Sequence, residues 1–214
     1  EPERREEIHS YLDSGEEIRA RVVLANTDPR RTFLGLVGVE NLDPAFAADI
    51  AGFRCESGSF RMNLALSGVP RFACLPDDGV DVHHRCFMAL TPSYAAFEDA
   101  YRAAAAGEIP EEPIIDAQVP TAADDSLAPP GCHILSLLAQ HFPYRLARGR
   151  SWDDEKERTA DLIVERMSRF IPNLPSLIVG RMVLSPLDLE RTYGLSGGDV
   201  YHGRLDPDQM FSLR

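Results

Sequence analysis

The chain has 214 residues, of which 44% are hydrophobic and 26% charged, a balance typical of folded proteins that excludes an intrinsically disordered chain. Its formal net charge of −12 opposes the approach of nucleic-acid phosphates, so we expect no nucleic-acid partner. No segment approaches the ~20 continuous apolar residues of a membrane-spanning helix, so membrane contact is not indicated, although the sequence leaves it open.

The first part of the chain predicts a hairpin and two short helices. Residues 1–10 are strongly charged and are expected to form a helix end or a surface segment. A turn signal at 13–15 precedes residues 18–24, whose period-two pattern predicts the second strand of a hairpin. Asn26, Asp28 and Pro29 favour a turn and end this strand. Short helices are expected at 33–37 and 44–50.

The middle of the chain predicts strands and one longer helix. Phe60, Met62, Leu64 and Leu66 alternate with Arg61, Asn63 and Ala65, which is typical of a strand with one buried face. Residues 83–91 are expected to form another strand. The alanine-rich segment 94–106 predicts a helix that stops at Gly107.

The last part predicts further strands at 114–119, 134–139 and 178–184. Ser151 and Asp154 resemble a capping box that opens a helix running to Pro172, and Pro186 favours the start of a helix over 187–193. Because strands and helices mix without regular βαβ alternation, we predict an α+β fold with a mixed, largely antiparallel sheet.

The residues by themselves indicate little catalytic chemistry. The chain has no G-x-G-x-x-G, G-x-x-x-x-G-K-[ST] or H-E-x-x-H motif. His83 and His84 would point to opposite faces of a strand, so we expect no metal site there. His133 and His141 flank an apolar run and are interpreted as edge residues of a strand.

Four cysteines, Cys55, Cys74, Cys86 and Cys132, are spaced without a C-x-x-C pair, which excludes a zinc ribbon or a thioredoxin-like motif. We expect them to be reduced core residues. The first ten residues lack the pattern of a signal peptide, so a cytoplasmic location is expected.

Gly197, Gly198 and Gly203 surround Asp199, Tyr201 and His202. Such a density of glycine indicates either a backbone that passes close to a ligand or an ordinary tight turn. The residues alone leave both interpretations open.

Three parts of the chain carry a resemblance to a known family. The segment 189–203, LERTYGLSGGDVYHG, followed by Asp208-Gln209-Met210-Phe211, resembles the late segment of phytoene dehydrogenase-like flavoproteins. The stretch 127–136, LAPPGCHILS, with Phe142-Pro143-Tyr144 and Ser151-Trp152-Asp153, is similar to the same family, and residues 21–29 resemble the strand that enters its substrate domain.

The resemblance implies a two-domain, Rossmann-like flavoprotein with FAD as cofactor. It predicts an uncertain segment over 1–11, the edge of the FAD-binding domain over 12–30, the substrate domain over 31–190 and a segment returning to the FAD domain over 191–214. Because the dinucleotide fingerprint is absent, the chain is expected to be a fragment that lacks most of the FAD domain and is inactive alone.

By the same resemblance, His202 is the predicted catalytic residue, and Asn26, Gly198 and Gln209 are predicted to contact the cofactor. The implied reaction is hydride transfer from a hydrophobic small-molecule substrate to flavin. The apolar face with Met62, Leu64, Leu135 and Leu137 could line the substrate pocket, or it could be ordinary core. The alternative function is a non-catalytic binding or scaffold module derived from the substrate domain. The oligomeric state is not indicated.

Overall fold

The computed structural model describes residues 8–56, 58–75, 79–91 and 93–210. These residues form two compact units, which divide between Ala51 and Gly52. The expected domain boundaries near residues 11, 30 and 190 concern the whole protein and stay predictions.

The first unit contains a hairpin and a group of helical turns. Strand β1 (Ile8–Tyr11) pairs antiparallel with β2 (Glu17–Ala20), so a hairpin forms as predicted. Of the two alternatives for this segment, the helix end is wrong for residues 8–10, which form a strand that pairs with β2; residues 1–7 lie outside the described part. The predicted strand ends at Ala20 instead of Leu24, which is 94% exposed. The helical segments are Arg31–Gly38, Val39–Asn41 and α1 (Pro44–Gly52).

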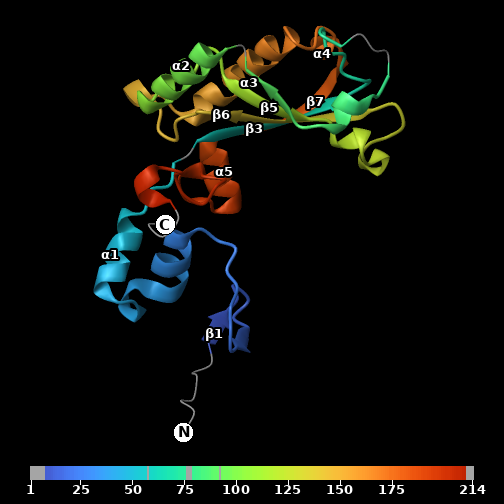
Figure 1. Ribbon diagram of the computed structural model, residues 1–214. Coiled ribbons are helices and arrows are strands. Elements are labelled where there is room, and N and C mark those ends of the chain that lie inside the picture. The colour runs from blue at the N-terminus through green and yellow to red at the C-terminus, as the bar shows by residue number, and fades with distance from the viewer. Residues whose placement is uncertain (1–7, 57, 76–78, 92, 211–214) are drawn as a thin grey trace. The chain divides into compact units, whose positions relative to one another are not determined.

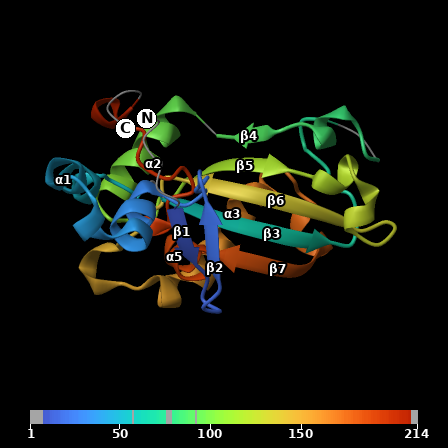
Figure 2. The ribbon, with the colours of Figure 1, turned by 90° about the horizontal axis from the view of Figure 1, so that it is seen from below.

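The second unit is built on a five-stranded antiparallel sheet in the order β4-β5-β6-β3-β7 (Figures 1 and 2). The strands are β3 (Ser59–Leu66), β4 (Met88–Leu90), β5 (Ile114–Gln118), β6 (His133–Gln140) and β7 (Ile178–Leu184). The main helices are α2 (Tyr94–Ala105), α3 (Trp152–Ser168), α4 (Leu174–Leu177) and α5 (Pro186–Tyr193). The predicted α+β class with a largely antiparallel sheet is therefore confirmed.

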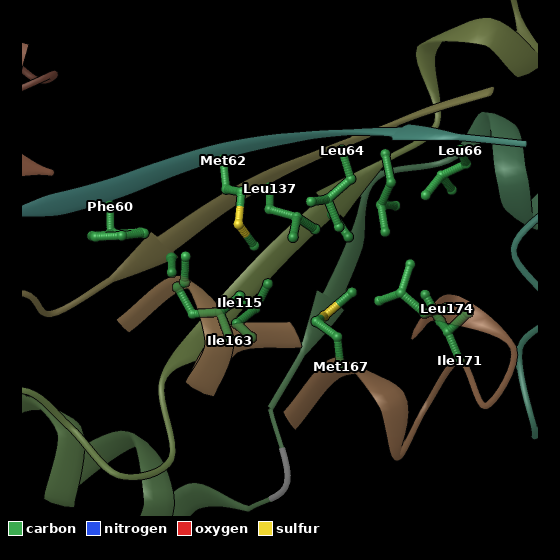
Figure 3. Close-up of a cluster of buried hydrophobic side chains, with 14 of the residues drawn as sticks. Phe60, Met62, Leu64, Leu66, Ile115, Leu137, Ile163, Met167, Ile171 and Leu174 are labelled. Atoms are coloured by element: carbon green, nitrogen blue, oxygen red, sulfur yellow. The ribbon is translucent and has the colours of Figure 1, made fainter. Parts of the chain in front are cut away.

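One face of this sheet packs on α3 and forms the core. In the register of β3 with β6, Met62 lies opposite Leu137 and Leu64 opposite Leu135, and none of these four side chains is exposed. Figure 3 shows the strand side chains pointing toward Ile163 and Met167 of α3. The suggestion that these apolar residues line a substrate pocket is therefore wrong, because α3 covers them.

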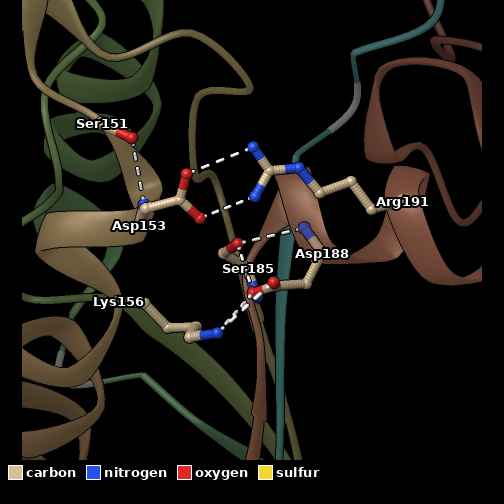
Figure 4. Close-up of polar contacts among 6 residues, drawn as sticks. All are labelled: Ser151, Asp153, Lys156, Ser185, Asp188 and Arg191. Atoms are coloured by element: carbon tan, nitrogen blue, oxygen red, sulfur yellow. Dashed lines mark hydrogen bonds and ion pairs between the residues drawn. The ribbon is translucent and has the colours of Figure 1, made fainter.

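Two ion pairs fix α5 to α3 (Figure 4). The guanidinium of Arg191 donates to both carboxylate oxygens of Asp153, over 2.6 and 3.2 Å, and Lys156 Nζ lies 3.2 Å from Asp188 Oδ2. Asp188 also completes a capping box with Ser185 at the start of α5. At the start of α3, the Ser151 hydroxyl accepts a hydrogen bond from the backbone N–H of Asp153. The helix therefore begins with a simple N-cap instead of the expected capping box between Ser151 and Asp154.

Two smaller expectations need correction. His83 and His84 lie in a helical turn (Val82–Arg85) before β4, where their rings stack 4.0 Å apart instead of pointing to opposite faces. The turn forms because Asp81 and His84 complete a capping box. Of the cysteines only Cys55 is buried, while Cys74 and Cys86 are exposed and Cys132 is intermediate. Across the described residues, no helix has both the length and the hydrophobicity to cross a bilayer.

Candidate functional site

The face of the sheet opposite α3 carries mostly half-buried and exposed side chains, with Asp116 the buried one among those assigned below. Figure 2 views the strands from this side, with α3 behind them. Residues directly opposite in an antiparallel ladder share a face, so the register assigns its members. They are Arg61, Asn63 and Ala65 of β3, Ile134, Ser136 and Leu138 of β6, Met182 and Leu184 of β7, and Asp116 of β5. We call this set the open face.

A short chain of hydrogen bonds orders the polar groups at its centre. Arg61 Nη2 donates to Ser136 Oγ over 3.0 Å, and Ser136 Oγ donates to Asn63 Oδ1 over 2.8 Å. Nearer one end, Gln140 Nε2 donates to the carboxylate of Asp116. The sequence analysis noted Arg61 and Asn63 only as the polar half of an alternation, and it missed their link to Ser136.

A cavity of about 620 Å³ adjoins this end of the sheet. This volume lies within the range of small-molecule sites, about 300–1,000 Å³. Its walls come from the start of β3, the last turn of α2, the segment after β6 and the segment after α5. The lining residues are Glu56, Gly58, Ser59, Tyr101, Ala104, Ala105, Ala106, Gly107, Gln140, His141, Phe142, Pro143, Tyr144, Arg145, Ala147, Tyr201, Arg204, Leu205 and Asp206.

Gln140 connects the two parts of the site, since it lines the cavity and also binds Asp116 on the open face. Gly58 allows the walls to come together, because a Cβ there would lie 1.3 Å from the carbonyl oxygen of Phe142. The cavity and the open face together are the candidate functional site.

His141 is the imidazole of this cavity. Its backbone has a φ of 62°, a left-handed conformation that is uncommon outside glycine. Its ring is held edge-on by Phe97, at 4.9 Å, and by Tyr101, at 5.9 Å. Nε2 is buried and has no hydrogen-bond partner among the described residues. Burial lowers the pKa of His141, because the interior disfavours the charged imidazolium.

Three tyrosines add hydroxyl groups to the walls. Burial, together with a hydrogen bond to Glu190, raises the pKa of Tyr144 to about 12. Burial and the nearby carboxylates of Asp116 and Asp199 raise the pKa of Tyr201. Tyr144 and Tyr201 therefore stay protonated at neutral pH; Tyr144 donates its proton to Glu190, and its oxygen can still accept a hydrogen bond from a bound molecule.

The lowered pKa of His141 makes stability depend on pH. Between the folded and the unfolded pKa, the unfolded chain binds more protons, so the free energy of unfolding should fall as pH drops through about 6.5. We expect His141→Asn to flatten this fall between about pH 7.5 and 5.5, because asparagine tolerates the same backbone but does not titrate there. Urea unfolding at several pH values measures the slope.

A slope that is unchanged in His141→Asn would contradict this role. Some slope should remain in the variant, because burial also lowers the pKa of His133. A His133→Asn, His141→Asn double variant is the matching control, because the remaining slope should disappear in it.

The structure places two of the predicted site residues in the turn after α5. Gly198 is buried with a φ of 65°, and a Cβ there would lie 2.1 Å from the carbonyl oxygen of Pro186. His202 has a φ of 58°, and its Nδ1 is buried without a partner among the described residues. Neither residue lines the cavity, whereas the neighbouring Tyr201 and Arg204 do.

The other two predicted residues lie elsewhere. Gln209 is buried, and its amide exchanges two hydrogen bonds of 2.8 Å with the backbone of Arg54 and donates a third to the carbonyl of Arg204. Asn26 is exposed in the first unit. The catalytic role of His202 and the cofactor contacts of Asn26, Gly198 and Gln209 stay predictions.

The chain is similar to known proteins over almost its whole length. No family model matches the sequence. The chain is 37% identical over 213 residues to pyridine nucleotide-disulfide oxidoreductase domain-containing protein 2 of Rattus norvegicus, and 36% identical over 213 residues to the protein of that name from Mus musculus. The chain is similar to part of these proteins. Each alignment covers 95% of this chain but 36% of the relative, so the chain spans about a third of their length.

Proposed function

We propose that this chain is the substrate-side part of an FAD-dependent oxidoreductase of the phytoene dehydrogenase-like class. The observation that carries the proposal is the identity of 37% over 213 residues to a protein named as an oxidoreductase. In this class the flavin takes a hydride from a substrate carbon, while the protein binds and orients the substrate and excludes water. The open face and the adjoining cavity are the surface that would do this, and the apolar side chains of the open face suit a hydrophobic substrate.

The glycine-rich segment does not fit the pyrophosphate of FAD. Backbone amides that cradle phosphates must be free of other partners. Here the Gly197 amide donates to Glu190 Oε1, and the Gly198 amide donates to Leu195 O, both over 2.9 Å. The amide of His202 donates to Asp199 O over 3.2 Å. In the proposal, the pyrophosphate is therefore held by other residues of the protein.

An absorbance spectrum of the purified full-length protein tests the proposal. We expect flavin bands near roughly 370 and 450 nm that survive desalting, as for any tightly bound isoalloxazine. A spectrum without these bands, also after addition of FAD, would contradict the proposal and favour the non-catalytic module.

A further inference from the structure

We propose that Arg61 anchors a carboxylate, so that the substrate is a long apolar molecule with one anionic end. This inference rests on the proposed function, because it names the substrate class of the same surface. The observation behind it is an arginine that lies at the middle of the open face with only neutral partners.

Arg61 is placed by the two strands that flank β3. It lies directly opposite Leu138 of β6 on one side and Leu184 of β7 on the other. Its guanidinium therefore rises between two leucines on the central part of the sheet. Ser136, two residues from Leu138 on β6, accepts the hydrogen bond from Nη2, and it donates in turn to Asn63.

The charge of Arg61 has no counterpart on the described residues. Several other arginines of this unit meet carboxylates, as Arg181 meets Glu157 and Asp161 and as Arg191 meets Asp153. Arg61 donates to a hydroxyl instead, and a guanidinium has five N–H donors of which this bond uses one. A half-buried cation beside leucines is costly unless it is paired, and a carboxylate can accept two parallel hydrogen bonds from it.

The surroundings favour a ligand with a single negative charge over one with two. Asp116 lies on the same face, opposite Leu138 in the next strand pair, and its carboxylate would repel a dianion such as a phosphate monoester. At physiological ionic strength, screening weakens the field of distant charges beyond about 8 Å. The net charge of −12 therefore has less effect on a bound carboxylate than the guanidinium in direct contact with it. Ile134, Leu138, Met182 and Leu184 supply the apolar surface for the rest of the molecule.

Binding of two probes of equal chain length to the full-length protein tests this inference. The probes are palmitate, which carries a carboxylate, and hexadecanol, which does not; equilibrium dialysis measures both dissociation constants. We expect the wild type to bind palmitate about tenfold more tightly, which is the effect of one charge-assisted contact. In Arg61→Gln this preference should disappear.

Arg181→Gln is the matched control, because it removes a cation from the face of the sheet that packs on α3 and should keep the preference. If Arg61→Gln does not fold, Ser136→Ala is tested in its place. This substitution keeps the charge of Arg61 but removes the hydroxyl that holds the guanidinium, so the preference for palmitate should become smaller. The inference is overturned if the wild type binds both probes equally or binds neither, or if folded Arg61→Gln keeps the preference. The flavin spectrum is independent of these results, so a wild type that shows flavin bands but no preference for palmitate refutes the anchor alone.

Discussion

Replacing Leu64 with alanine is expected to lower the free energy of unfolding of the second unit by about 2–5 kcal/mol. Leu64 is fully buried on β3, beneath α3. The substitution removes apolar contacts and leaves a cavity that the sheet cannot collapse to fill, because β3 is bonded on both sides by β6 and β7.

Urea unfolding followed by tryptophan fluorescence measures this loss. Trp152 is the single tryptophan of the chain and is buried in the same core, so its emission reports the second unit. Met182→Ala is the matched control, because Met182 lies on the open face and is 46% exposed; we expect a loss below about 1 kcal/mol. Equal losses in the two variants would show that the core does not lie between the sheet and α3.

Gly198→Ala is the second substitution with a large expected effect. A left-handed φ costs an alanine about 1–2 kcal/mol, and the overlap with the Pro186 carbonyl should add about 1–3 kcal/mol, because backbone has to move. The substitution should displace the segment that follows α5, which continues into the wall of the cavity. Urea unfolding with the Trp152 signal again measures the change.

Gly149→Ala separates the two causes. Gly149 has a similar φ of 69°, but a Cβ there would meet nothing within 4 Å. We expect it to show only the conformational cost of about 1–2 kcal/mol. If Gly198→Ala costs no more than Gly149→Ala, the glycine is not required by packing on Pro186, and the prediction of a cofactor contact gains weight.

The alternation of apolar and polar residues predicted the strands well. It placed strands close to β3, β5, β6 and β7, and the helices α2, α3 and α5 followed from capping residues, periodicity and breakers. These are local properties, because a period of two or of 3.6 residues can be seen within a short window. The same reasoning failed for β1, because its four residues Ile8–Tyr11 are too few to give a local strand signal; the strand forms by pairing with β2.

The candidate site could be predicted only in part. The sequence directed attention to the segment 197–203, and one of its residues, Tyr201, does line the cavity. The sequence did not indicate His141 as a cavity residue. The local sequence around a histidine that follows a strand does not show whether its ring is exposed to solvent or packs against two aromatic rings of α2. Phe97 and Tyr101, which hold its ring, are about 40 residues away in the sequence.

The amino-acid sequence by itself determined the α+β class, the approximate bounds of most strands of the sheet and which side chains of each strand share a face. Only the tertiary structure decided that the apolar face is core and not a pocket, since α3 buries the side with Met62 and Leu64 and leaves the side with Arg61 open. It also decided which strands are neighbours: Arg61 and Ser136 are 75 residues apart in the sequence and meet only because β3 pairs with β6. Strand pairing over such separations depends on the packing of the whole unit, which no local pattern records.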